Sequence, residues 1–360
     1  MQHDLFLPAR LGTLELRNRI VMAPMTRNRS LGNVPQAFAA TYYGQRAGAG
    51  LIVTEGTAPS PNGLGYARIP GLFSTEQITG WRQVTEAVHQ HGGRIFAQLM
   101  HTGRIGHPAN LPTGAEVLGP MAEAASGDIW TDTSGLRPHP VPRAMTEFDL
   151  QQVIAEYVKA ARNAREAGFD GVELHAANGY LLEQFLNPGI NRRSDRWGGS
   201  RSNRARLLLE TTQAVAKAIG ADRVGVRLSP FGVFNDMPPY AGIEAAYAWL
   251  AGQLSDLGIA YLHLVDHSSM GAPAVPDSTK AAIRKAFHGS LILSGGYDRA
   301  RAEADLAAGS ADFIAFGRPF IANPELVEQL HSGAPLADSD PATFYTSGEA
   351  GYTDYPALAV

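Results

Sequence analysis

The chain has 360 residues, of which 44% are hydrophobic and 18% charged, and a formal net charge of −4 at pH 7; this is the balance of a globular protein with a large core. The pI near 6.3 gives no field that would attract a polyanion, so nucleic acid is not an expected partner. No run reaches the roughly 20 apolar residues that span a bilayer, and residues 1–12 lack an export signal, so we expect a cytoplasmic protein without a membrane partner. The absence of cysteine excludes disulfides and cysteine nucleophiles.

In chain order, short apolar runs rich in β-branched residues alternate with segments of helical periodicity. The alternation is typical of parallel βα units. The predicted strands are 19–23, 50–56, 94–100, 171–175, 224–229, 261–265, 291–296 and 313–318. The predicted helices are 35–48, 75–91, 146–168, 201–220, 243–258, 278–287, 299–308 and 324–332. Eight such units predict an α/β fold, a TIM (β/α)8 barrel, which often forms a single domain at this length.

Three segments lie outside the repeat, whose core we place at about 19–332. Residues around Leu11 and Gly12 alternate apolar and polar side chains and predict a small hairpin that closes the barrel's bottom. Residues 101–145 are rich in Pro, Gly and Thr, which predicts an excursion over one barrel face after strand 3. Residues 333–360 form a C-terminal tail. We therefore expect one domain over 1–360.

Reactive groups in such a barrel gather where the strands end. After the last two strands come glycines and an arginine: Gly295, Gly296, Gly317 and Arg318. Glycine lets the backbone approach an anion closely, and the arginine fork can hold two phosphate oxygens. The pattern favours a phosphate site, although a tight turn and a surface ion pair would explain the same residues.

Thr26, Gln98 and Arg227 follow or end three other strands. Gln98 can donate and accept hydrogen bonds at once, which suits the amide-like edge of a flat heterocycle, and Arg227 would favour electron density on one side of such a ring. A buried arginine needs a partner. The alternative is therefore an ion pair between Arg227 and Glu55 or Glu173.

His175, Asn178 and Tyr180 lie in one short segment at the end of strand 4. The first two can converge on one oxygen atom, as the donors of an oxyanion clamp do. A tyrosine in the same loop can act as a proton donor. Each residue alone could equally be structural, and only together with the phosphate and ring sites do they favour a reactive site.

Two non-redox alternatives remain: a barrel that binds a phosphorylated metabolite, or one that binds a metal at the rim. The histidines near the rim are those that could serve as ligands: His101, His175, His263 and His267. Strand 1 contributes neither His nor Asp, which weighs against the metal.

Several motifs, which run from Leu5 to about Tyr355, together resemble the Old Yellow Enzyme family of flavin-dependent ene-reductases. They are APMTR (23–27), TEGT (54–57), QLMHTGR (98–104), HAANGYLLEQFLNP (175–188), NRRSDRWGGSRSNRARLLLE (191–210) and FGRPFIANPEL (316–326). The resemblance implies noncovalent FMN, reduced by NADPH or NADH, and hydride transfer to the β-carbon of an activated alkene. Quinones, nitroesters and nitroaromatics are further implied acceptors.

The same resemblance implies a role for each residue. Thr26 would bind the flavin's carbonyl edge, Gln98 and Arg227 its pyrimidine end, and the phosphate would lie on Gly295, Gly296, Gly317 and Arg318. Further cofactor contacts are expected from Pro24, Met25 and Gly56. His175 and Asn178 would bind the acceptor's carbonyl or nitro oxygen, and Tyr180 would protonate the α-carbon.

Departures from the family pattern concern the pocket. Met100 stands where many relatives have tryptophan and is expected to widen the pocket, and Tyr66 and Tyr352 are expected to line it. Ala176 and Leu207 replace a glycine and a phenylalanine often seen there. Thr26, instead of cysteine, indicates the classical branch, which makes a monomer or weak homodimer the expected state.

Overall fold

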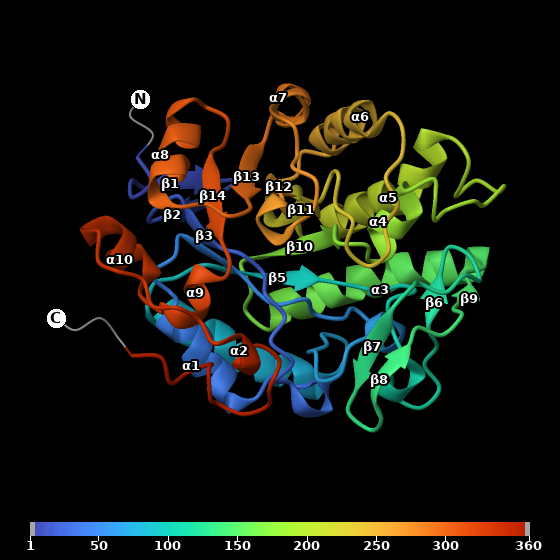
Figure 1. Ribbon diagram of the computed structural model, residues 1–360, viewed down its shortest axis with the longest axis horizontal. Helices are drawn as coiled ribbons and strands as arrows, with labels where there is room; N and C mark the ends of the chain where they lie inside the picture. The colour runs from blue at the N-terminus through green and yellow to red at the C-terminus, as the bar shows by residue number, and fades with distance from the viewer. Residues whose placement is uncertain (1–3, 357–360) are drawn as a thin grey trace.

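The strands and helices form a closed barrel (Figure 1). The computed structural model describes residues 4–356. The barrel strands are β3 (Ile20–Met22), β4 (Leu51–Val53), β5 (Ile95–Leu99), β10 (Gly171–Ala176), β11 (Val224–Leu228), β12 (Tyr261–Val265), β13 (Ser290–Ser294) and β14 (Phe313–Phe316). All pair in parallel, and the ring closes between β14 and β3 and between β5 and β10. Each overlaps a predicted strand, so the TIM barrel prediction is confirmed.

Helices cover the outside of the barrel. Those predicted are α1 (Ala37–Gln45), α2 (Thr75–Gln90), α3 (Glu147–Glu166), α5 (Arg201–Ile219), α6 (Ile243–Asp256), α7 (Asp277–Ala286), α8 (Arg299–Ala307) and α10 (Leu326–Ser332). Two short helices, α4 (Leu181–Leu186) and α9 (Pro319–Ala322), were not predicted. Every residue of α4 is buried, Glu183 and Gln184 included, and six residues are too few to display a helical period. None of the helices in residues 4–356 combines the length and the apolarity that crossing a bilayer requires.

The N-terminal hairpin closes the barrel's bottom, as predicted. It pairs β1 (Ala9–Leu11) with β2 (Leu14–Leu16) in antiparallel. Gly12 turns the chain at φ 58°, and a Cβ there would lie 2.6 Å from the carbonyl oxygen of Asp222. Leu11 and Leu16 are buried in one cluster with apolar side chains of the barrel interior, among them Phe96, Tyr261 and Phe313.

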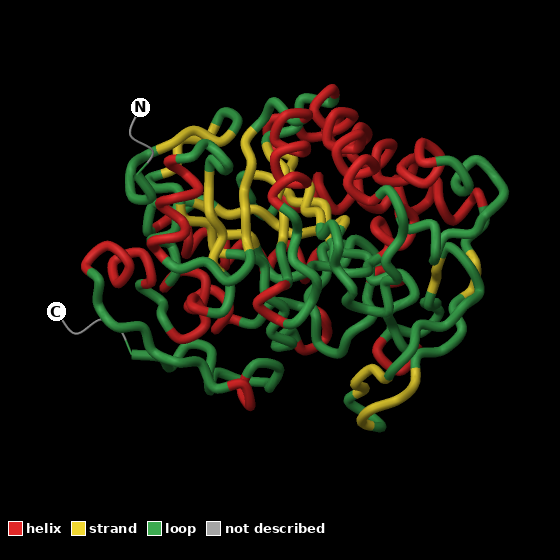
Figure 2. The backbone as a smooth tube through the Cα atoms, turned by 45° about the horizontal axis from the view of Figure 1, so that its top comes forward, coloured by secondary structure: helices red, strands yellow, loops and turns green. Residues whose placement is uncertain are grey.

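The predicted excursion and the C-terminal segment lie at the other end of the barrel, where the loops gather (Figure 2). The excursion contains β6 (Leu118–Gly119) paired with β9 (Arg143–Ala144), and the antiparallel hairpin of β7 (Asp128–Thr131) and β8 (Gly135–Pro138). Arg29 binds the C-terminal segment through the carbonyl oxygens of Thr343, Phe344, Gly348 and Ala350. Residues 357–360 of the predicted tail and residues 1–3 of the predicted domain lie outside the described residues.

A capping box begins α3. The backbone N–H of Asp149 donates to Thr146 Oγ1 at 3.2 Å, and the backbone N–H of Thr146 donates to Asp149 Oδ2 at 2.7 Å. We expect Thr146→Ala to lower the free energy of unfolding by about 1 kcal/mol, because it removes a cap from the helix start. Urea unfolding measures this loss. Thr133→Ala, at an exposed turn, is the control, and equal effects of the two changes would contradict the prediction.

Candidate active site

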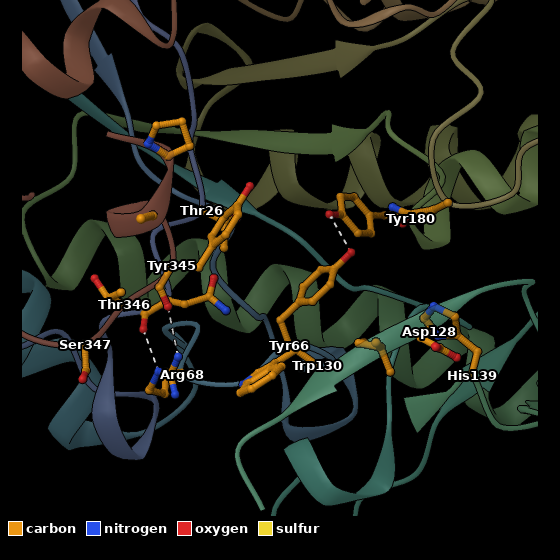
Figure 3. Close-up of a pocket in the computed structure, with 15 residues that line it drawn as sticks. Thr26, Tyr66, Arg68, Asp128, Trp130, His139, Tyr180, Tyr345, Thr346 and Ser347 are labelled. Atoms are coloured by element: carbon orange, nitrogen blue, oxygen red, sulfur yellow. Dashed lines mark hydrogen bonds between the residues drawn. The ribbon is translucent and has the colours of Figure 1, made fainter. Parts of the chain in front are cut away.

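A cavity of about 800 Å³ opens at the loop end of the barrel. Its walls come from the loops after β3 and β4, from the β7–β8 hairpin, from the loop after β10 and from the C-terminal segment (Figure 3). The lining residues that carry the following argument are Thr26, Tyr66, Arg68, Tyr180, Asn235 and Tyr345. The structure thus places Thr26, Tyr66 and Tyr180, three residues singled out from the sequence, around one space.

Tyr180 faces Tyr66 across this cavity. Their hydroxyl oxygens share a hydrogen bond of 3.2 Å, which Figure 3 marks by a dashed line, and the rings meet edge to face at 6.1 Å between centroids. The His175 ring also packs edge to face with Tyr180, at 4.9 Å between centroids. Burial raises the pKa of both phenols, so each keeps its proton at neutral pH.

The loop that carries Asn178 is held by side chains from neighbouring elements. Asn178 has a positive φ of 59°, a conformation that asparagine tolerates better than most residues. Its backbone N–H donates to Ser229 Oγ at 2.8 Å, and its carbonyl oxygen accepts from Asn235 Nδ2 at 2.7 Å. Glu183 of α4 accepts the Gly179 N–H and the Ser229 hydroxyl. These bonds fix the backbone from both sides.

His175 is prepared as a hydrogen-bond donor. Its Nδ1 accepts the backbone N–H of Ala177 at 3.3 Å. Burial, followed by the nearby charge of Arg227, lowers its pKa well below the usual range, so the ring is neutral. A neutral imidazole that accepts at Nδ1 carries its hydrogen on Nε2. Within residues 4–356 this Nε2–H has no partner, which leaves it available to a ligand.

The carboxamide of Asn178 meets an unexpected neighbour. Its Oδ1 lies 2.6 Å from Nε2 of His267, in the loop after β12. The sequence had offered His267 only as a metal candidate. The oxygen of the amide is therefore engaged, and its NH2 group is the end that remains free.

Beneath these loops lies a buried polar network inside the barrel. Glu173 accepts three hydrogen bonds: from Gln98 Nε2 at 2.7 Å, from the Tyr261 hydroxyl at 3.1 Å and from His263 Nδ1 at 2.9 Å. Strand register places His175, Arg227 and His263 side by side on β10, β11 and β12. One of the two amide hydrogens of Gln98 is thereby bonded to Glu173, so Gln98 has only the other to donate to the edge of a ring.

Arg227 makes no ion pair among the described residues, so the alternative of a salt bridge to Glu55 or Glu173 is wrong. Its side chain is 6% exposed, and its Nε is buried without a hydrogen-bond partner. The charge of Glu173 acts on it from a distance, yet burial still lowers the Arg227 pKa. A buried donor without a partner is costly. The electron-rich edge of a flavin ring would satisfy it, so the residues fit the cofactor implied by the sequence.

The residues expected to bind a phosphate differ in what the fold requires of them. Gly295 has φ 130°, and a Cβ there would lie 2.1 Å from the carbonyl oxygen of Asp266, so the turn itself requires glycine. Gly296 is exposed and also has a positive φ, of 62°. Glycine is not sterically required at Gly317, since a Cβ there would make only ordinary van der Waals contact, 3.8 Å from Ala23 and Met25. Arg318 is exposed. Its positive charge is one of the causes that lower the pKa of His267, in the loop after β12.

Two side chains expected to line the pocket, Tyr352 and Met100, are not among the residues that line this cavity. Tyr352 is 1% exposed and stacks on Tyr42 with ring centroids 3.8 Å apart, because the C-terminal segment folds it into the core; Tyr345 lines the cavity instead. Met100 is 1% exposed and packs behind Tyr66 and Tyr180. Its sulfur occupies the space that glycine leaves at position 56, where a Cβ would lie 2.5 Å from Sδ.

Pro24 and Met25 follow β3 and adjoin Thr26 as expected. Sequence reasoning missed the cavity residues Arg68, Trp130, Asn235 and Tyr345. Arg68 joins three loops: it pairs with Asp132 of the excursion, and it donates to the carbonyl oxygens of Asn28 and Tyr345. In the sequence, the only sign of a role for Arg68 was its position between two loop segments that contain glycine.

The histidines of the metal alternative are engaged elsewhere. His263 binds Glu173 and Ser294, and His101 is buried with its pKa lowered by burial to about 3. Residues 4–356 contain no group of three or more histidines and carboxylates that could hold a metal ion.

Comparison with known proteins decides the family. The model of the NADH:flavin oxidoreductase / NADH oxidase family matches residues 4–337. The chain belongs to this family. It is 45% identical to morphinone reductase, with a TM-score of 0.96 over 99% of this chain and 97% of that one. The Old Yellow Enzyme homologue from Zymomonas mobilis is 41% identical, with a TM-score of 0.95 over 99% of this chain and all of that one.

Among curated relatives, 12-oxophytodienoate reductase 1 of Oryza sativa subsp. japonica is 41% identical over 98% of this chain and 93% of that protein. The resemblance to the Old Yellow Enzyme family is confirmed. The family member described here is an FMN-dependent oxidoreductase that takes its electrons from a nicotinamide and reduces activated alkenes. A barrel without redox chemistry is not supported.

Proposed function

We propose that the cavity at the loop end of the barrel is where this family member reduces its acceptor, an α,β-unsaturated carbonyl or nitro compound. The bound flavin supplies the hydride. The chain's own residues grip the acceptor's oxygen, orient the double bond and deliver a proton. The observation that carries the proposal is the contact of both His175 and Tyr66 with Tyr180, which lines this cavity.

His175 Nε2–H and the NH2 group of Asn178 would donate to the acceptor's oxygen. Negative charge develops there as the β-carbon is reduced, and fixed neutral donors stabilise it without reorganising. Tyr180 would give its hydroxyl proton to the α-carbon, and Tyr66 would hold that hydroxyl in place. The neutral states of His175 and Tyr180 follow from the directions of their pKa shifts.

The cofactor would lie across the barrel mouth. Thr26 would bind its carbonyl edge, Gln98 and Arg227 its pyrimidine end, and Gly295, Gly296, Gly317 and Arg318 its phosphate, with Pro24, Met25 and Gly56 adjoining. The unpartnered Nε of Arg227 supports this placement. We also propose a single cytoplasmic domain that acts as a monomer or weak homodimer, without nucleic-acid or membrane partners; the net charge of −4 supports a freely soluble state.

Phenol binding tests the proposed oxyanion site. A phenolate places its oxygen where the acceptor's oxygen would lie, so its affinity reports the donors. We expect Asn178→Ala to raise the Kd of 4-chlorophenol for the flavin-loaded enzyme by about 10- to 100-fold, the range for a lost hydrogen bond to a charged oxygen. Absorbance titration of the bound flavin measures it, with Gln213→Ala, an exposed amide on α5, as control. An unchanged Kd would refute the proposed role.

A further inference from the structure

His267 lies shortly after the end of β12, just before the turn that begins at Ser268, and its ring is half-buried. The ring centroids of His267 and Phe234 lie 4.6 Å apart, and the ring planes meet at 70° in an edge-to-face contact. Its Nε2 points at Asn178 Oδ1 from 2.6 Å, a short and therefore strong hydrogen bond. Its Nδ1 has no partner in residues 4–356. The imidazole is thus aimed at a single group, the carboxamide of Asn178.

The Asn178 side chain can still change in one way, by rotation of its amide group. The backbone of Asn178 is held through its N–H by Ser229 and through its carbonyl oxygen by Asn235. Its amide group can still rotate by half a turn, which exchanges an oxygen for a nitrogen of nearly the same size. One orientation presents NH2 to an acceptor's oxygen and assists the reaction. The other presents Oδ1 and repels it.

The charges around His267 favour the productive orientation. Burial and the positive charges of Arg227 and Arg318 outweigh Asp266 and lower the His267 pKa to about 4, so the ring is neutral near pH 7. With nothing bound to Nδ1, its single hydrogen can reside on Nε2 and be donated to Asn178 Oδ1. This bond turns the NH2 of Asn178 away from His267.

We propose that His267 is a positioning residue that holds the Asn178 carboxamide with its NH2 directed at the acceptor's oxygen. The inference rests on the proposed function, in which Asn178 is one of the two oxyanion donors. His267 would contact neither flavin nor acceptor and would act only through the orientation of that amide.

A matched pair of variants separates orientation from packing. His267→Leu fills the space against Phe234 but offers no hydrogen, whereas His267→Gln keeps an N–H donor on a side chain of similar reach. In the flavin-loaded, prereduced enzyme we expect His267→Leu to slow reoxidation by 2-cyclohexenone roughly 10-fold, the scale of one hydrogen bond that biases the amide. His267→Gln should stay within about threefold of wild type. Reoxidation by ferricyanide, which needs no oxyanion donor, should be the same in all three.

A double-mutant cycle with Asn178→Ala identifies the route of the effect. If His267 acts through Asn178, His267→Leu should cause no further loss in the Asn178→Ala background. A slow Asn178→Ala enzyme with a fully active His267→Leu enzyme would overturn the inference alone. So would equal losses for Leu and Gln, or a further loss in the double variant. A fully active Asn178→Ala enzyme would overturn the proposed function itself.

Discussion

Tyr180→Phe should slow the reoxidation of the reduced enzyme by 2-cyclohexenone by about 10²- to 10⁴-fold, the usual contribution of a positioned proton donor. The phenylalanine keeps the ring contact with His175, at 4.9 Å in the wild type, and removes only the hydroxyl. Flavin reduction by NADPH should change by less than about threefold, because that step needs no proton from this residue. Stopped-flow absorbance under anaerobic conditions measures the two half-reactions separately.

A nitroalkene provides an internal control for Tyr180→Phe. Its reduced anion is stable in water and can be protonated after release, so its reoxidation rate should fall far less than that of the enone. Tyr66→Phe keeps the Tyr180 proton and removes its 3.2 Å partner, so a loss of no more than about 10-fold is expected. Equal losses with enone and nitroalkene would show that Tyr180 positions the substrate and does not protonate it.

The pH dependence should follow the Tyr180 proton. Burial raises the pKa of this phenol above its ordinary range, so the acid form persists through neutral and mildly alkaline pH. The rate with enone should therefore be flat there and fall only where an ordinary tyrosine would already be ionised. In Tyr180→Phe this alkaline fall should disappear.

The barrel could be predicted because its signals are local. Each strand is a short apolar run, each helix has its own periodicity, and the glycines that end helices, such as Gly168 and Gly220, have the positive φ angles expected of them. The helix α4 could not be predicted, since Leu181–Leu186 is too short to display a helical period. Its polar residues, Glu183 and Gln184, are buried with the apolar ones, so they mark no solvent-facing side.

The candidate site was predictable where one loop carries its residues. His175 and Tyr180 are close in sequence and their rings also meet in space, with Asn178 between them in the same segment. Residues that meet only through the fold were missed or misread. His267 approaches Asn178 from 89 residues away, and Tyr345 replaces Tyr352 in the cavity because the C-terminal segment turns the latter onto Tyr42. Such pairings depend on how loops pack, and no spacing rule encodes them.

For the same reason, the sequence did not predict the buried polar network around Glu173. The network joins strands far apart in the sequence: Glu173 lies on β10, Gln98 on the adjacent β5, and Tyr261 and His263 on β12, which β11 separates from β10. The sequence suggested an ion pair with Arg227 and a rim position for His263. In the structure the Glu173 carboxylate is bonded to His263 and to the amide of Gln98, while the Nε of Arg227 is buried without a partner.

Glu173→Ala should lower the free energy of unfolding by about 3–5 kcal/mol, because it leaves several buried donors without an acceptor at about 1–3 kcal/mol each. The carboxylate is fully buried and holds three donors. Burial by itself would raise its pKa, but the charges of His263 and Arg227 and the hydrogen bonds of His263 and Gln98 outweigh this, so the pKa is lowered. Its removal leaves three donors unsatisfied and Arg227 without a nearby negative charge.

Urea unfolding at one fixed, saturating FMN concentration measures this loss, since a ligand that binds the native state adds to apparent stability. Glu303→Ala is the matched control: its carboxylate pairs with Arg299 at 2.7 Å but is 41% exposed, and an exposed pair contributes at most about 1 kcal/mol. Because the native pKa of Glu173 is lowered, its contribution is complete above the ordinary glutamate pKa and is lost as the pH falls through the native pKa. The gap between wild type and Glu173→Gln should therefore narrow in acid. A cost for Glu173→Ala no larger than that of Glu303→Ala would show that the barrel interior does not depend on this charge.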